Sequence, residues 1–165
     1  MDTKIIMGID PGLVHTGWSI LTKKNYDDIK YIDSGIINTS NTDPLGERLS
    51  FIYNSISNII DRYNPSHIAM EEVFVNMNPK SSRKLIMARS ASFIACSNKK
   101  YEVYEYMPNA IKKSITGLGH ASKNQVYVMI QKILNVSLDL TKFPSKTMDS
   151  IDAIAIALCH AFNLK

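Results

Sequence analysis

Two short apolar segments of this sequence each end in an acidic residue. Residues 4–10 are rich in isoleucine and stop at Asp10, directly before a Pro-Gly turn signal, and residues 67–71 form a short apolar run that stops at Glu71. Runs of this kind, with little polar alternation, are typical of strands buried on both faces. Functional crevices in open α/β sheets lie beyond the carboxyl ends of the strands, so we expect Asp10 and Glu71 to lie close together.

The stretches around these two runs predict the rest of a mixed sheet. Residues 18–21 and 31–37 are expected to form two further strands, which would make an antiparallel meander with the first. Apolar side chains over residues 45–60 recur at spacings of three and four, which predicts an amphipathic helix. Residues 42–43 contain a candidate for its N-cap, followed by Pro44 at the expected first helical position.

The second half of the chain adds one more strand and several helices. Residues 101–106 return to strand character, Gly117 is expected to end a short helix, and Ser122 with Gln125 forms a capping-box pair at the head of another. This order predicts an α/β fold whose mixed five-stranded sheet carries helices on both faces, in one domain over residues 1–165. Helices are expected from Ser81 to Cys96, from Pro108 to Gly117, from Ser122 to about Leu134, and from about Thr147 to the end.

The charges are unevenly distributed, although the net charge is only +4. Residues 80–146 hold twelve lysines and arginines against three acids, whereas seven basic and twelve acidic residues share the rest of the chain. The basic half, which includes Arg83 and Lys84, is therefore expected to face a polyanion such as nucleic acid. An ordinary solvated surface would show the same charge pattern.

Targeting signals and cysteine usage point to the cytoplasm. The apolar run at residues 5–9 is interrupted by Asp10, so it does not make a signal peptide, and no other stretch approaches the roughly 20 apolar residues of a membrane span. Cys96 and Cys159 lie in apolar, helix-like stretches rather than in metal-ligand spacing. We expect reduced core cysteines and a reducing compartment.

Four carboxylates carry the candidate chemistry. Asp149 and Asp152 are three residues apart near the start of the last expected helix, hence on one face. Gathered with Asp10 and Glu71, they would repel one another unless a hard cation lay between them, and Mg²⁺ or Mn²⁺ suits carboxylate and water ligands.

Each acid also has a structural explanation. Asp10 could be a turn residue, Asp149 an N-cap or helix-dipole charge, and Asp152 a surface acid. Glu71 is harder to explain in this way, because a carboxylate in a buried strand is costly without a partner.

The motifs around these acids resemble those of the RuvC family of Holliday junction resolvases. Residues 8–12, continuing to residues 16–18, are similar to the opening motif of the family. Residues 69–74 and 149–155 resemble its second and third acidic motifs, and residues 111–126 resemble its lysine-bearing segment. The similarity spans nearly the whole chain in the same order. Two departures are Ser90, where a glycine is expected, and the position of Asp149, which is histidine in some relatives.

The resemblance implies a ribonuclease-H-like fold, a homodimer, and Mg²⁺-dependent symmetric nicking of two strands of a four-way DNA junction. It also implies the branch-migration complex RuvAB as a partner. The helix expected from Ser81 to Cys96 is apolar or small around most of its circumference, which independently favours an isologous dimer contact. The roles that the resemblance transfers are metal binding for Asp10, Glu71, Asp149 and Asp152, contact near the scissile phosphate for Lys112 and Lys123, and base contact for Phe74.

The mechanistic hypothesis is an in-line attack by water with two metal ions about 4 Å apart, bridged by Asp10. Lys112 or Lys123 would neutralise charge in the transition state, or they are plain solvated lysines. Actin-like sugar kinases and chaperone ATPases share the first motif, but 165 residues are too few for their two lobes. The same fold and acids are also compatible with a nuclease for another branched nucleic acid, and the fold alone with a non-catalytic nucleic-acid-binding domain.

Overall fold

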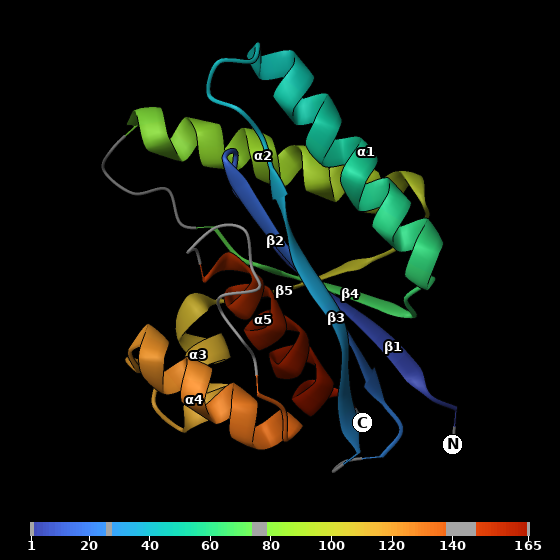
Figure 1. Cartoon of the computed structure of the whole chain (residues 1–165), viewed down its shortest axis with the longest axis vertical. Coiled ribbons are helices and arrows are strands. Elements are labelled where there is room, and N and C mark those ends of the chain that lie inside the picture. The colour runs from blue at the N-terminus through green and yellow to red at the C-terminus, as the bar shows by residue number, and fades with distance from the viewer. Residues whose placement is uncertain (1, 26–27, 74–78, 138–147, 165) are drawn as a thin grey trace.

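A five-stranded mixed sheet forms the centre of the molecule (Figure 1). The computed structural model describes residues 2–25, 28–73, 79–137 and 148–164. The strand order is β3-β2-β1-β4-β5, in which the first three strands are antiparallel neighbours, and β4 and β5 run parallel to β1. The strands are β1 Lys4–Asp10, β2 His15–Lys23, β3 Ile29–Asn38, β4 His67–Glu71 and β5 Val103–Tyr106, and the helices are α1 Leu45–Tyr63, α2 Pro79–Asn98, α3 Pro108–Thr116, α4 Lys123–Leu134 and α5 Asp149–Asn163.

Alternation along the central strands separates two apolar cores. On β1, Met7 and Ile9 pack with α1 and α2 on one face of the sheet. Ile6 packs on the other face with the core that α3, α4 and α5 complete. Because side chains two residues apart share a face, Gly8 and Asp10 belong with Ile6, on the face that α5 covers. The strand therefore aims Asp10 at α5.

The two parallel strands β4 and β5 continue this division. Ala69 on β4 belongs to the core beneath α5, whereas Ile68 and Met70 belong to the core beneath α1 and α2. Glu71, two residues after Ala69, is accordingly placed on the α5 face at the carboxyl end of the strand. Asp10 and Glu71, the two acids at the strand ends, thus lie on the face that α5 covers.

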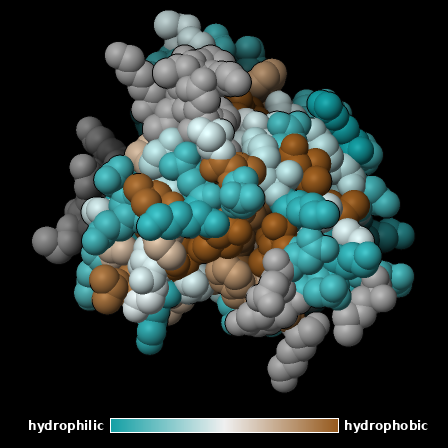
Figure 2. Space-filling model, turned by 60° about the horizontal axis from the view of Figure 1, so that its bottom comes forward, coloured by the Kyte–Doolittle hydropathy of each residue, from teal (hydrophilic) through white to brown (hydrophobic). Residues whose placement is uncertain are grey.

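The apolar interior beneath α5 extends to the surface at the end of the molecule where α4 and the last turns of α5 lie. Figure 2 shows apolar residues gathered toward the middle of this end, with hydrophilic residues around them. Ile133, Phe162 and Leu164 are partly buried hydrophobic residues that pack against the α5 core.

The start of α1 differs from the expectation. Pro44 is the N-cap residue and not the first helical residue, and no side chain of residues 42–43 caps the helix. The ring fixes φ at −55°, which a helix would accept, but ψ is 141°, so the backbone is still extended there. As expected of an N-cap residue, Pro44 accepts the first helical hydrogen bond with its carbonyl, from Arg48 N at 3.1 Å.

The other expected helix boundaries are close to the observed ones. Gly117 ends α3 with φ of 80°, a backbone conformation that favours glycine. Ser122 and Gln125 form the predicted capping box at the head of α4. α2 extends two residues beyond the expected range at each end, and α5 begins at Asp149, whereas Thr147 lies outside the described residues.

Cys96 and Cys159 are buried and not joined in a disulfide, as predicted. Burial raises the pKa of the Cys96 thiol to about 12, so this group stays protonated at neutral pH. None of the helices in the described ranges has the length and apolar character needed to cross a bilayer.

Candidate active site

Three carboxylates converge where β1 ends and α5 begins. One oxygen each from Asp10, Asp149 and Asp152 lies within 4.8 Å of the other two. Asp10 is the last residue of β1, and the two others are the first and fourth residues of α5. The spacing of three places Asp149 and Asp152 on one helix face, as predicted, and the positive end of the helix dipole favours carboxylates there.

The electrostatics of this group favour a cation. Removal from water raises the pKa of Asp10 well above its ordinary value, and the charges of Asp152, Glu71 and Asp149 raise it further, in that order. A pKa raised by neighbouring carboxylates means that the ionised group is under mutual repulsion. A divalent cation with oxygen ligands would relieve it, so the donor set fits Mg²⁺ or Mn²⁺.

Glu71 lies beside this group but outside its closest set of oxygens. It lines a pocket of about 220 Å³ together with Asp152, Lys112 and Lys123. Burial and then the charge of Asp152 raise the pKa of Glu71, while the two lysines oppose that shift. The structure therefore brings all four predicted acids to one site, with Glu71 on the lysine side of it.

The two predicted lysines reach the pocket from different helices. Lys123, the first residue of α4, places its Nζ 2.6 Å from Oδ2 of Asp152, and Lys112 comes from α3. Burial lowers the pKa of Lys123, but the hydrogen bond and charge of Asp152 outweigh burial and the net shift is upward. Lys123 therefore stays charged at neutral pH, next to the acids that would hold a metal.

The remaining predicted residues lie away from the pocket. Arg83 and Lys84 are exposed near the start of α2, and neither lines it. Phe74 lies outside the described residues, so its contact with bases stays a prediction.

Two residues that shape the turn after Asp10 were missed by the sequence analysis. Buried Thr16 donates its hydroxyl to the carbonyl of Gly12 at 2.7 Å and accepts the Gly12 N–H at 3.2 Å, which closes the turn. Buried Arg48 of α1 donates to the carbonyl of Leu13 at 3.2 Å and to Thr39 Oγ1 at 2.9 Å. Its signal in the sequence is an arginine four residues before Ile52, on the otherwise apolar face of the helix.

The five-stranded sheet and the acids at the ends of β1 and β4 and at the head of α5 define a protein of the ribonuclease-H-like class. The family model described as "Crossover junction endodeoxyribonuclease RuvC" matches residues 6–160. The chain belongs to this family.

Curated relatives match along nearly their whole length. A crossover junction endodeoxyribonuclease RuvC of Ehrlichia chaffeensis is 48% identical over 160 residues, which cover 97% of both chains. The protein of the same name from Ehrlichia canis is 46% identical over 158 residues, which cover 96% of both.

Solved structures give the same picture. The structure of T. thermophilus RuvC in complex with a Holliday junction substrate superposes with a TM-score of 0.87 at 29% identity, covering 97% of this chain and 94% of that one. The Fowlpox virus resolvase has a TM-score of 0.61 at 19% identity, covering 97% of this chain and 100% of that one, and shares the fold.

Proposed function

We propose that this protein is a structure-specific DNA endonuclease that resolves four-way junctions by nicking two strands symmetrically, in recombination and repair. The observation that carries the proposal is the close group formed by Asp10, Asp149 and Asp152, in a chain that belongs to the RuvC family. Such a group provides an oxygen-ligand site for a hard cation at the carboxyl edge of the sheet.

The proposed cofactor is Mg²⁺, with two ions in each active site and Mn²⁺ as a substitute. Asp10, Asp149, Asp152 and Glu71 would hold it, which agrees with the donor set and with the raised pKa of Asp10. When bound, the metal would supply a Lewis acid and a water of lowered pKa.

The protein itself supplies charge and geometry for the phosphate. Lys123 and Lys112 line the pocket beside Glu71 and Asp152, so two cations are available to a phosphate that approaches the acids. Positioned positive groups stabilise the negative charge that grows on a phosphate during hydrolysis. We therefore assign both lysines to the scissile phosphate.

The proposed ligand is four-way junction DNA. The T. thermophilus relative was captured with such a substrate, and the exposed Arg83 and Lys84 of α2 add positive charge for the duplex arms. Stacking of Phe74 on an unpaired base stays part of the proposal.

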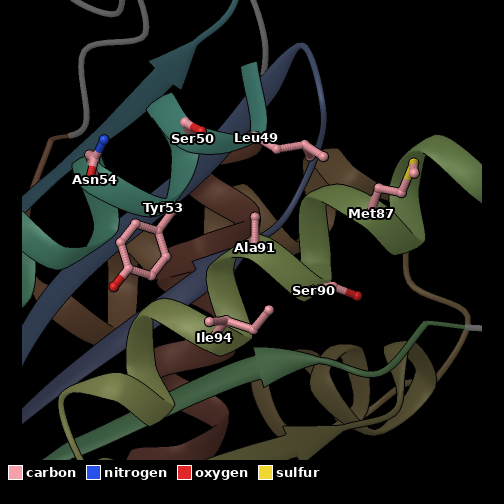
Figure 3. Close-up of a pocket in the computed structure, with 8 residues that line it drawn as sticks. All are labelled: Leu49, Ser50, Tyr53, Asn54, Met87, Ser90, Ala91 and Ile94. Atoms are coloured by element: carbon pink, nitrogen blue, oxygen red, sulfur yellow. The ribbon is translucent and has the colours of Figure 1, made fainter. Parts of the chain in front are cut away.

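The proposed assembly is a homodimer, because two equivalent strands must be cut. Side chains of α1 and α2 line a groove of about 430 Å³. Figure 3 shows these side chains, among them Tyr53 of α1 and Ala91 of α2. Ile94 of α2, at the rim of this groove, is 53% exposed. An isologous contact through α2 would cover it. The same proposal includes RuvAB as partner and a cytoplasmic location.

The central experiment compares cleavage of a synthetic four-way junction, a linear duplex and a flap in Mg²⁺. We expect paired, symmetric nicks in the junction and little cutting of the other two. Equal cutting of the flap would support a nuclease for another branched DNA and contradict the proposal.

Asp10→Asn tests the metal site on the same junction. It keeps the size of the side chain but removes the charge, so cleavage should fall by about 10³-fold or more while junction binding survives. Wild-type protein in Ca²⁺ should likewise bind without cutting. Nicking by Asp10→Asn near the wild-type rate would refute the carboxylate mechanism.

Light scattering at micromolar concentration tests the assembly. We expect twice the monomer mass of 18.5 kDa. The Ile94→Asp variant should shift the mass toward that of the monomer and lose paired nicking. A wild-type monomer that retains paired nicking would exclude the homodimer.

A further inference from the structure

The backbone of α5 lies directly on two glycines of the sheet. A Cβ atom added to Gly17 would lie 2.0 Å from the carbonyl oxygen of Asp149, and one added to Gly8 would lie 2.1 Å from the carbonyl oxygen of Ala153. Cβ atoms essentially never approach other heavy atoms within 3.0 Å. Hydrogen is therefore the only side chain that fits at either position with α5 at its present height.

A buried hydroxyl fastens the same part of α5. Ser19 is paired with Gly8 across β1 and β2, and its Oγ donates to the carbonyl oxygen of Ala153 at 2.9 Å. Both residues are buried, so the hydrogen bond is made without competition from water. Gly8, Gly17 and Ser19 together form a seat for α5 on the sheet.

This seat is connected to the carboxylates by the register of the sheet. Gly17 is the residue paired with Asp10 between β1 and β2, and the backbone that rests on Gly17 belongs to Asp149 itself. The height of the helix above Gly17 therefore sets the separation between the carboxylates of Asp10 and Asp149.

We propose that Gly17, supported by Gly8 and Ser19, is a positioning residue for the metal site. The inference rests on the proposed function, since it concerns the site at which the metal would bind. Alanine at position 17 would have to lift the Asp149 carbonyl from 2.0 Å to beyond 3.0 Å. Metal ligands must be held to within about 0.5 Å, so a lift of this size separates Asp149 and Asp152 from Asp10.

A purely structural role for Gly17 predicts something different. In that case Gly17→Ala lowers the stability of the protein, and the molecules that remain folded bind metal as well as wild type does. The positioning role predicts weaker metal binding by folded molecules. Metal affinity and stability must therefore be measured separately.

The experiment measures Mn²⁺ binding by electron paramagnetic resonance, without DNA, at a temperature where each variant is folded by circular dichroism. Gly17→Ala should weaken Mn²⁺ binding by about tenfold or more. The matched control is Gly35→Ala, whose added Cβ would lie 2.9 Å from the ring of Trp18 and not against α5. It should lower stability but leave Mn²⁺ affinity within about twofold, since its strain falls on Trp18, which packs on the face of the sheet opposite α5.

Ser19→Ala provides a second variant, because it removes one hydroxyl without adding volume. We expect Mn²⁺ binding to weaken by about threefold, the loss of one buried hydrogen bond that holds α5 in place. Its control is Ser92→Ala in α2, a buried serine whose hydroxyl bonds to Ala88 of its own helix. If Gly17→Ala does not fold, unchanged Mn²⁺ affinity in Ser19→Ala overturns the inference.

Asp10→Asn separates failure of the inference from failure of the proposed function. If Asp10→Asn loses Mn²⁺ binding and folded Gly17→Ala binds like wild type, the positioning role is wrong and the metal site stands. If Asp10→Asn binds Mn²⁺ like wild type, the proposed metal site is wrong, and the inference falls with it.

Discussion

The two faces of the sheet are covered by helices in different ways. On one face, α1 contacts the sheet through a stripe of side chains that includes Ile52, Ile56 and Ile60, and α1 and α2 pack together beside a groove that both line. On the other face, α5 is buried at every residue from Ser150 to Ala161 except Asp152, and its backbone touches the sheet. Contacts through long side chains tolerate small shifts, whereas backbone contact does not. The carboxylates lie on the face built by backbone contact.

Removal of core volume on each face gives the largest expected effect on stability. Ile154→Ala in α5 and Ile56→Ala in α1 should each lower the free energy of unfolding by about 2–5 kcal/mol, because both side chains are completely buried. Only Ile154→Ala should also weaken Mn²⁺ binding by folded protein. Urea denaturation and Mn²⁺ titration check the two parts. Equal losses of metal affinity in both variants would contradict the division between the faces.

Charge removal should separate chemistry on the α5 face from binding on α2. Lys123→Ala and Lys112→Ala should slow junction cleavage by about 10–100-fold with little loss of binding, because both lysines line the acidic pocket. Arg83→Ala and Lys84→Ala should mainly weaken binding and flatten its dependence on salt. Gel-shift and cleavage assays on one labelled junction distinguish the pairs. Similar losses of binding in all four variants would show that the lysines are assigned wrongly.

Acid should destabilise the α5 face. Burial lowers the pKa of His160 to about 4, with smaller contributions from the charges of His67 and Lys23. Because the folded pKa lies below the unfolded value of about 6.5, the full stability is present above pH 6.5 and is lost as pH falls toward 4. The loss should reach up to about 2 kcal/mol.

Thermal unfolding from pH 7 to pH 4 measures this dependence. His160→Phe removes the titrating group and should unfold with a flatter pH dependence than wild type over this range. The hydrogen bond between His160 Nδ1 and the Tyr106 hydroxyl, 2.7 Å, is also lost, so stability at pH 7 should fall slightly. An unchanged acid slope in His160→Phe would assign the pH dependence to other groups.

The smallest expected effect is a gain in stability. Gly46 is exposed in the first turn of α1, and a Cβ added there would meet nothing within 4 Å. Gly46→Ala should therefore stabilise the protein by about 0.5–1 kcal/mol through helix propensity. The same substitution at Gly17 should destabilise it. Equal signs at the two positions, measured by urea denaturation, would contradict the contrast between the faces.

Local patterns were enough to predict most of the fold. The apolar runs that end at Asp10 and Glu71, and the capping box of Ser122 and Gln125, depend on residues close in sequence. The prediction at Pro44 was wrong because a proline fixes φ but leaves ψ to the surrounding structure.

In the candidate site, the sequence predicted only the features that depend on strand ends and on residue spacing along a helix. These patterns placed Asp10, Glu71, Asp149 and Asp152 at one edge of the sheet. They did not predict that Glu71 lies outside the close group formed by the other three carboxylates. The contact of Gly17 with the Asp149 backbone joins residues over 130 positions apart, and no local pattern reports such an approach.

β2 holds α5 at three levels along its length. Gly17 lies under Asp149, Ser19 binds Ala153, and the buried Nζ of Lys23 donates to the carbonyls of Ala161 and Leu164 at 2.6 and 2.8 Å. Six residues of strand span roughly 20 Å, and twelve to fifteen residues of helix span roughly 18–22 Å, so the two elements are matched in length.

The matched lengths fix the orientation of the head of α5 relative to β1. One residue inserted between Asp152 and Ala161 would turn the head of α5 by about 100° relative to its fastened end, because a helix has 3.6 residues per turn. The two aspartates would then leave the face that meets β1. An insertion in α5 therefore keeps the aspartates on the face that meets β1 only if it adds whole turns of helix. β2 must then lengthen by the same distance, at about 3.3 Å per residue.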